Sequence, residues 1–256
     1  MPDIPRQEVA IVTGASRGLG AALVEALGAP QRLVIGVARS ENEAQVARMQ
    51  ARGFGFAYRR CDLADRAQTA GLTHWLTSVL RRQRAARRFL LINNAGVVEP
   101  VEAIETLPVD ALVAALQVNL VAAMQLSAAF LAATDKFTGT RIIVNISSGA
   151  ARHPVAGWAS YCTGKAALDM FTRCIAEEQA THANPARVCS LAPGVLDTEM
   201  QEVLRAADFP SVDRFRSLHA SGDLVAPADA ARRIIAHLER RDFGSTVIDD
   251  LRRSGV

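Results

Sequence analysis

A tyrosine and a lysine stand four residues apart at Tyr161 and Lys165, in a chain of 256 residues that has two tyrosines and two lysines in all. Residues four apart in a helix share one face, so the two side chains would come within reach of each other. A neighbouring ammonium group favours the phenolate and would lower the pKa of the tyrosine from about 10. We therefore expect Tyr161 to exchange a proton with a substrate, provided that the chain also forms a cofactor site. The alternative is a surface pair that arises by chance.

A glycine-rich turn follows the first apolar run of the chain, residues 9–12. Its glycines have the spacing Gly14-x-x-x-Gly18-x-Gly20, and the helix-forming segment 21–27 comes directly after them. A strand, a glycine turn and a helix start present free backbone N–H groups and the positive end of a helix dipole to a phosphate. The turn therefore predicts the phosphate site of a dinucleotide, although glycines also occur in ordinary turns.

Two arginines occupy positions whose side chains would determine whether the protein binds NADPH or NADH. The second apolar run, residues 33–38, ends at Arg39, where NAD-specific sites carry an acidic residue for the ribose 2′-hydroxyl. Another arginine, Arg17, lies in the glycine turn, and two guanidinium groups would suit a 2′-phosphate. We therefore predict NADPH as the cofactor. The alternative is that both arginines face solvent in this arginine-rich chain.

Short apolar runs alternate with helix-forming segments along the whole chain. Strands are predicted at residues 9–12, 33–38, 54–60, 89–92, 141–146, 188–192 and 246–248. Helices are predicted at residues 21–27, 41–52, 66–83, 111–133 and 228–238, and one more contains Tyr161. No repeat and no linker rich in Pro, Gly or Ser divides the chain. The pattern predicts an α/β fold, with residues 1–256 forming one Rossmann-like domain around a doubly wound parallel sheet of about seven strands.

Composition and charge exclude several classes of protein. A net charge of +3 does not indicate a nucleic-acid-binding protein. The four cysteines form no CxxC pair, so we expect reduced thiols and no metal site. Residues 1–7 lack a secretory signal, and polar residues such as Gln117 interrupt the apolar stretch 111–133, which argues against a membrane span. We expect a cytoplasmic protein whose apolar helix packs against a partner subunit, in a homodimer or homotetramer.

Several short motifs follow one another along the chain. They are Thr13-Gly14-x-x-x-Gly18-x-Gly20, Asn93-Asn94-Ala95-Gly96, Asn119, Ser148, Tyr161-x-x-x-Lys165 and Pro193-Gly194. In this order and approximate spacing they resemble the short-chain dehydrogenase/reductase family, over about residues 8–248. Residues 161–170 and 192–201 further resemble the branch that contains sepiapterin reductase and bacterial diketone reductases of the benzil type. The resemblance implies hydride transfer between a nicotinamide cofactor and a carbonyl group.

The resemblance also implies a role for each polar residue of the site. Tyr161 would give its proton to the carbonyl oxygen, and Ser148 would contact the substrate by orienting that oxygen. Lys165 would lower the pKa of Tyr161 and bind the nicotinamide ribose. Asn119 would hold a distortion of its helix and a water molecule that links Lys165 to solvent. Without the other motifs, Asn119 would be interpreted as an ordinary core amide.

Residues at the ends of the predicted strands would line the path of the cofactor. In addition to Tyr161, Lys165, Arg17 and Arg39, they are Gly14, Ser16, Gly18, Leu19, Gly20, Asp62, Leu63, Asn94, Ala95, Gly96, Pro193, Gly194, Val195 and Thr198. Asp62 would accept a hydrogen bond from an adenine amino group.

The substrate would lie beside a less regular segment, about residues 199–226. Trp158 and Met200 would form walls of its pocket, although large apolar residues near a helix start also serve simple packing. In the sepiapterin reductase branch, an aspartate near the C-terminus holds the pterin. Asp249 occupies the matching place after a gap of one residue, with Asp250 and a plain surface carboxylate as the alternatives.

Three functions fit the sequence. The first is NADPH-dependent reduction of a ketone or vicinal dicarbonyl that is similar to sepiapterin or benzil. The second is oxidation of an alcohol or hydroxysteroid by an NAD(P)-dependent dehydrogenase, which the two arginines oppose. The third is a non-enzymatic dinucleotide sensor, which would be expected to lack part of the set formed by Ser148, Tyr161 and Lys165. The physiological substrate and the stereochemistry of reduction stay open.

Overall fold

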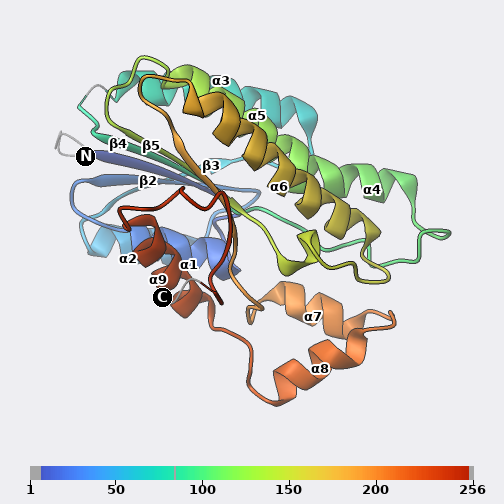
Figure 1. Cartoon of the computed structure of the whole chain (residues 1–256). Coiled ribbons are helices and arrows are strands. Elements are labelled where there is room, and N and C mark those ends of the chain that lie inside the picture. Colours follow the sequence, from blue (N-terminus) through green and yellow to red (C-terminus); the bar gives the residue numbers. More distant parts are fainter. Residues whose placement is uncertain (1–6, 84, 254–256) are drawn as a thin grey trace.

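A seven-stranded parallel sheet forms the centre of the computed structural model, which describes residues 7–83 and 85–253 (Figure 1). The strands are β1 (Glu8–Thr13), β2 (Arg32–Ala38), β3 (Gly55–Arg60), β4 (Arg88–Asn93), β5 (Thr140–Ile146), β6 (Arg187–Ala192) and β7 (Ile248–Asp250). They lie side by side in the order β3-β2-β1-β4-β5-β6-β7. The chain adds strands on one side of β1 and then on the other, so a ligand-binding switch point lies between β1 and β4.

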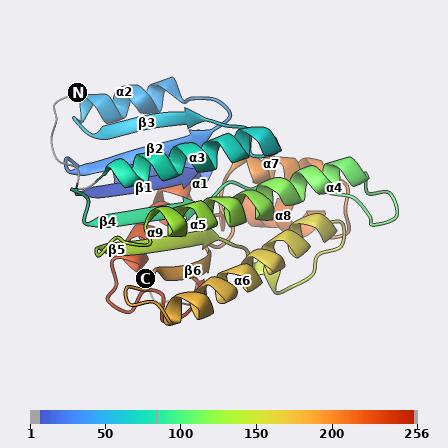
Figure 2. The ribbon, with the colours of Figure 1, turned by 90° about the horizontal axis from the view of Figure 1, so that it is seen from above.

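Helices cover both faces of the sheet, as predicted. They are α1 (Gly18–Leu27), α2 (Glu43–Ala51), α3 (Arg66–Arg82), α4 (Val109–Leu116), α5 (Ala122–Ala133), α6 (Ala159–Ala180), α7 (Glu199–Ala206), α8 (Val212–Ala220) and α9 (Pro227–Leu238). Helices α3, α5 and α6 lie on one face, and α1, α2 and α9 on the other (Figures 1 and 2). The fold is the single Rossmann-like α/β domain that the sequence predicts.

The apolar strands divide their side chains between these two layers. In β1, Ala10 and Val12 pack with Leu23 of α1, whereas Val9 and Ile11 pack with residues of α3 and α5 on the opposite face. Alternate residues of a strand point to opposite faces, so a strand covered on both sides must be apolar throughout. This is why the buried strands read as continuous apolar runs.

The long apolar segment is interrupted where Asn119 was expected to distort its helix. Residues Gln117–Val121 form a π-helical turn between α4 and α5. The Asn119 side chain accepts a hydrogen bond from Val97 N (2.9 Å) and donates one to Val97 O (2.8 Å). The amide therefore joins this turn to the loop after β4, and the predicted helix distortion is confirmed.

The C-terminal part departs from the prediction in two places. The last strand is β7, Ile248–Asp250, rather than residues 246–248, because it pairs with Ser190–Ala192 at the very end of β6. The less regular segment 199–226 contains two helices, α7 and α8, which lie beyond the carboxyl ends of the strands (Figure 1). The predicted absence of a signal sequence concerns residues 1–7, of which 1–6 lie outside the described residues.

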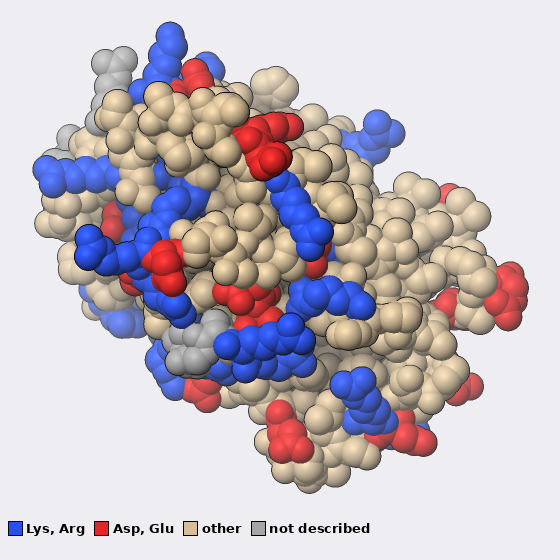
Figure 3. Space-filling view, in the orientation of Figure 1, with Lys and Arg blue, Asp and Glu red and all other residues tan. Residues whose placement is uncertain are grey.

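The surface combines charged and apolar regions. Acidic and basic side chains lie next to one another on the face shown in Figure 3. The stretch Val109–Ala133 is long and apolar enough to cross a membrane by length and composition, with a mean hydropathy of 1.6. In the fold it is the broken α4–α5 helix, and its residues Leu126 and Phe130 are buried against the sheet.

Candidate active site

A cleft of about 1870 Å³ runs along the carboxyl ends of the strands. Pockets for one drug-sized ligand usually measure about 300 to 1000 Å³, so this cleft has room for a dinucleotide together with a substrate. All the predicted cofactor and substrate residues line it apart from Asp249. Asn119 lies behind its wall, fully buried.

The glycine turn fits a dinucleotide phosphate. Gly14 and Gly18 have φ values of +67° and +52°, which side chains other than glycine rarely adopt. A Cβ atom on Gly20 would lie 2.0 Å from Gly14 O, so α1 can approach the turn only with glycine there. No acidic residue occupies the first turn of α1, which leaves its N-terminus favourable for an anion.

Hydrogen bonds hold the ends of β1 and β4 together at the switch point. The buried Thr13 hydroxyl accepts hydrogen bonds from Asn94 N and Ala95 N, both at 3.0 Å. The Asn94 side chain donates in return to Thr13 O at 2.9 Å. The two loops that would carry a dinucleotide are therefore fixed relative to each other.

The two predicted cofactor arginines differ in their surroundings. Arg17 forms an ion pair with Glu199 at the start of α7, on the opposite side of the cleft. Arg39 is exposed and lines the cleft, and within the described residues it forms no ion pair. Asp62 also lines this end, and one of its carboxylate oxygens accepts from Ala64 N at 3.0 Å. Arg39 is thus the arginine whose guanidinium is available to a phosphate.

Helix α6 places the tyrosine and lysine on one buried face. Tyr161 is 7 % exposed and Lys165 is 2 % exposed. The Lys165 ammonium donates to Ile146 O at 2.8 Å and lies 5.7 Å from the centre of the Tyr161 ring. The end of β5 therefore positions the lysine, as α6 passes over it.

The pKa of Tyr161 differs from the prediction. Burial raises it above its ordinary value of 10.0, and a hydrogen bond with the Ser148 hydroxyl lowers it by a smaller amount. Burial also lowers the pKa of Lys165 to about 8, while the negative charge of Asp169 raises it. The sequence predicted a lowered pKa from Lys165 together with the charge of an oxidised nicotinamide, whereas burial of the phenol acts in the opposite direction and raises the pKa.

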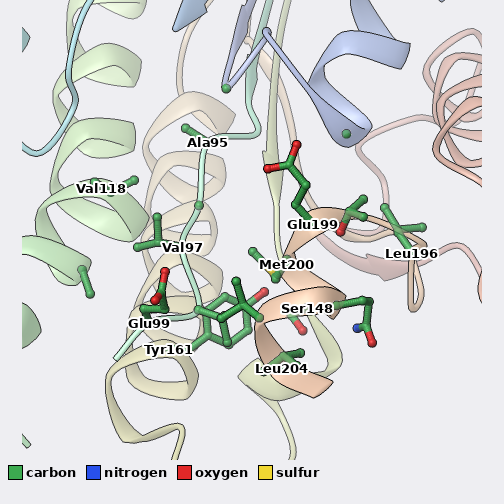
Figure 4. Close-up of a pocket in the computed structure, with 18 of the residues that line it drawn as sticks. Ala95, Val97, Glu99, Val118, Ser148, Tyr161, Leu196, Glu199, Met200 and Leu204 are labelled. Carbon is green, nitrogen blue, oxygen red and sulfur yellow. The ribbon is translucent and has the colours of Figure 1, made fainter. Parts of the chain in front are cut away.

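Ser148 and Tyr161 meet in the part of the cleft that a substrate can enter. Figure 4 shows them between the segment with Val97 and Glu99 on one side and helix α7, with Met200, on the other. Ser148 is half-buried, and its hydroxyl oxygen accepts from Ala150 N at 3.2 Å. A carbonyl oxygen between the two hydroxyl groups would receive hydrogen bonds from both.

An aromatic cluster forms one wall of this part of the cleft. The Trp158 ring lies edge-on to Tyr161, with 5.7 Å between ring centres, and tilted to Phe215 at 5.1 Å. Phe209 and Met200 belong to the same apolar cluster. Trp158 and Met200 line the cleft, as predicted, and Trp158 is also tightly packed, so the wall and packing interpretations both hold.

Sequence reasoning missed Asp169, a buried carboxylate one helical turn beyond Lys165. It accepts hydrogen bonds from the hydroxyls of Ser147 and Ser190, each at 2.6 Å, and pairs with Arg152 at 3.4 Å. The spacing of four residues after Lys165 could have indicated it. The carboxylate connects α6 to the ends of β5 and β6, next to the predicted catalytic serine.

The structure does not support Asp249 as the substrate anchor. Its carboxylate pairs with His237 of α9 at 3.2 Å and lines a separate small cavity. The strand β7 directs it towards α9, away from Ser148 and Tyr161. The alternative, Asp250, is buried and pairs with Arg152 and Arg252. Of this C-terminal group, Arg252 lines the main cleft.

Comparison with known proteins identifies the class. The model of the short chain dehydrogenase family matches residues 8–208. The chain therefore belongs to the short-chain dehydrogenase/reductase family of oxidoreductases, as the sequence motifs predicted.

Particular relatives have more specific names. Benzil reductase ((S)-benzoin forming) of Bacillus cereus is 34% identical over 236 residues, which cover 91% of this chain and 94% of the relative. Sepiapterin reductase of Rattus norvegicus is 33% identical over 252 residues, with 93% of each chain covered. Among solved structures, the KRED1-Pglu enzyme has a TM-score of 0.79 at 29% identity, with 93% of this chain and 99% of that chain covered. A metagenomic short-chain oxidoreductase in complex with NADP has a TM-score of 0.72 at 28% identity, with 96% of each chain covered.

Proposed function

We propose that the protein is an NADPH-dependent carbonyl reductase that acts on a ketone or vicinal dicarbonyl. The observation that carries the proposal is one cleft in which Ser148, Tyr161 and Lys165 lie at one end and the glycine turn at the other. The relatives named benzil reductase and sepiapterin reductase match nearly the whole chain, which supports this class of substrate.

The chemistry follows from the positions of the three side chains. The nicotinamide, when bound, supplies a hydride to the carbonyl carbon. The Tyr161 hydroxyl gives its proton to the carbonyl oxygen, and the Ser148 hydroxyl donates a hydrogen bond that orients this oxygen. Lys165, held by Ile146 O, places a positive charge beside the phenolate that remains after proton transfer.

A protonated Tyr161 hydroxyl is what the reduction of a carbonyl requires, because that reaction consumes a proton. Burial raises the pKa of the phenol above its ordinary value of 10.0, so the phenol carries its proton at neutral pH. Oxidation of an alcohol would instead require the phenolate as a base.

Arg39 supports NADPH as the cofactor. Its guanidinium lines the cleft just after β2, where it would bind a 2′-phosphate by charge-assisted hydrogen bonds. Arg17 would add a second donor once it leaves Glu199. The solved relative in complex with NADP has the same fold over 96% of this chain.

The apolar wall supports a bulky, partly aromatic substrate. Trp158, Phe215 and, from α7, Met200 and Leu204 belong to one cluster that offers aromatic and aliphatic surface beside the two hydroxyl groups. Such a wall fits the rings of a benzil-like diketone and would also receive a flat pterin.

Measuring the absorbance of the reduced cofactor tests the proposal directly. Purified protein is mixed with NADPH or NADH and a panel of carbonyl compounds, which includes benzil, sepiapterin, a quinone and a simple aldehyde. We expect NADPH to be consumed fastest with a vicinal dicarbonyl. Faster reduction of NAD by alcohols would favour a dehydrogenase, and binding of dinucleotide without turnover of any compound would favour a sensor.

We also propose a homo-oligomer in the cytoplasm. Large apolar side chains on the outer surface of α4, α5 and α6 are exposed, with Val109 at 69 %, Val113 at 59 % and Met170 at 56 %. An apolar surface of this kind is typical of contacts between subunits. All four cysteines are free, which fits a reducing compartment. Light scattering of the purified protein measures the number of subunits, and a monomer at micromolar concentration would contradict the oligomer.

A further inference from the structure

The chain following the last strand brings an arginine into the cleft beside the catalytic serine. Arg252 lines the cleft two residues after β7. Its Nη2 lies 3.5 Å from the place that a Cβ of Gly149 would occupy, and its Cγ lies 3.8 Å from the corresponding place at Gly194. Gly149 follows Ser148 directly in the sequence. The guanidinium therefore lies across the ends of β5 and β6, next to the residue that orients the reacting oxygen.

A chain of alternating charges holds this arginine in place. Asp250 accepts from Arg252 Nε at 2.9 Å and from its Nη2 at 2.6 Å. The same carboxylate pairs with Arg152 at 3.0 Å, and Arg152 reaches Asp169 at 3.4 Å. Asp250 is 4 % exposed, so the anchor is buried whereas the Arg252 side chain is 54 % exposed. A bidentate pair to a buried carboxylate fixes the plane of the guanidinium.

The guanidinium retains donors for a ligand. An arginine carries five N–H donors, and the contacts to Asp250 use those on Nε and Nη2. Within the described residues, Nη1 of Arg252 has no hydrogen-bond partner. Because Asp250 already balances the charge, the free donors suit a neutral oxygen acceptor rather than a second carboxylate.

We propose that Arg252 binds the unreduced carbonyl oxygen of a vicinal dicarbonyl substrate and thereby determines the preference for dicarbonyls over simple ketones. This inference rests on the proposed carbonyl reductase function. When Ser148 and Tyr161 hold one oxygen, the second oxygen lies on the adjacent carbon. Arg252 lines the same cleft as Ser148 and Tyr161 and lies beside Gly149, so its guanidinium would donate to that second oxygen. The hydride still attacks the carbon of the first carbonyl, and Tyr161 still supplies the proton.

Benzil and deoxybenzoin form a matched pair of substrates for the test. Deoxybenzoin keeps both phenyl rings and one carbonyl group and lacks only the second oxygen. We expect Arg252→Gln to lower kcat/KM for benzil roughly 10- to 100-fold, which corresponds to the loss of one hydrogen bond from a charged donor. The same substitution should change kcat/KM for deoxybenzoin by no more than about twofold. Arg253→Gln is the control, because Arg253 has the same charge and lines the separate cavity beside Asp249. Arg253→Gln should leave kcat/KM unchanged for both benzil and deoxybenzoin.

Each outcome has one meaning. An equal loss for benzil and deoxybenzoin would show that Arg252 only supports the fold near Ser148, and would overturn the proposal. If Arg252→Gln does not fold, Arg252→Met keeps an apolar stem without a donor, and an unchanged ratio of kcat/KM for the two substrates in that variant would also overturn the proposal. Wild-type protein that reduces neither compound would instead contradict the proposed function. The dissociation constant of NADPH, measured by fluorescence, should be the same in wild type and Arg252→Gln.

Discussion

Burial of Lys165 predicts an unusual dependence of stability on pH. The unfolded lysine holds its proton up to about pH 10.5, whereas the folded one releases it near pH 8. Between these values the unfolded chain binds more protons, so the free energy of unfolding rises as the pH increases. Well below pH 8 both states are protonated and this contribution is constant. The difference between the two pKa values corresponds to about 3 kcal/mol.

The variant Lys165→Met isolates this effect, because it removes the titrating group and keeps a long apolar stem. Wild type should gain about 2 kcal/mol relative to the variant between pH 8 and pH 10, because the folded lysine is half deprotonated at pH 8 and the unfolded lysine begins to lose its proton near pH 10. Other groups titrate in the same range: burial raises the pKa of Cys61 to about 11 and that of Cys189 to about 12, which lowers stability at high pH. Both proteins contain these thiols, so their contribution cancels in the difference.

Urea denaturation at pH 8, 9 and 10 measures the effect, with tryptophan fluorescence as the signal for unfolding. The lost hydrogen bond to Ile146 O shifts the variant by a constant amount and leaves the slope with pH unaffected. A difference between the two proteins that stays the same from pH 8 to pH 10 would refute the reasoning. It would mean that the Lys165 ammonium is as well solvated in the folded protein as in the unfolded chain.

Three further substitutions test the site. Tyr161→Phe should lower turnover of a carbonyl substrate about a hundredfold or more while NADPH binding, measured by fluorescence titration, is retained; undiminished turnover would exclude Tyr161 as the acid. Arg39→Asp should lower the affinity for NADPH about tenfold or more relative to that for NADH in the same titration, because it removes a cation and adds an anion near the 2′-phosphate. An unchanged ratio of the two affinities would show that Arg39 only faces water. Asp169→Asn should lower the pKa of Lys165 further, because the charge of Asp169 raises it in the wild type. If the pH profile of turnover is the same in the variant and the wild type, the two charges act independently.

The fold could be predicted because its determinants are local. Buried parallel strands must be apolar on both faces, and the turns between them need glycine where the backbone has a positive φ, as at Gly14. The expected strands β1 to β6 therefore agree with the structure to within one residue at each end. The exception is β7, which has only three residues and is determined by its pairing with β6 rather than by its own composition.

Site residues that belong to short motifs were predicted, whereas contacts between residues far apart in the sequence were not. Tyr161, Lys165 and Ser148 belong to short motifs, and the structure brings them to one cleft. The ion pair of Arg17 with Glu199 joins residues 182 positions apart, and no local pattern indicates it. The direction of Asp249 depends on which face of β7 meets α9. The resemblance to the sepiapterin reductase branch therefore suggested Asp249 for the substrate site, whereas its carboxylate pairs with His237 in a separate cavity.

The pKa of Tyr161 shows a different limit. The spacing of Tyr161 and Lys165 correctly indicates that the two side chains share a helix face, but spacing contains no measure of burial. Tyr161 is almost completely removed from water, and this burial raises the pKa of the phenol. A prediction of chemistry from spacing needs the solvation of the site as well as its contacts.

Helix α7 takes part in both halves of the cleft. At its first residue, Glu199 pairs with Arg17 of the glycine turn, while the next residue, Met200, and Leu204, just over one turn further on, line the same cleft. A dinucleotide bound at the glycine turn and a substrate bound beside Met200 would therefore both contact this helix. If the first ligand changes the affinity for the second, the second changes the affinity for the first by the same factor. We expect the affinities for the two ligands to be coupled through this helix.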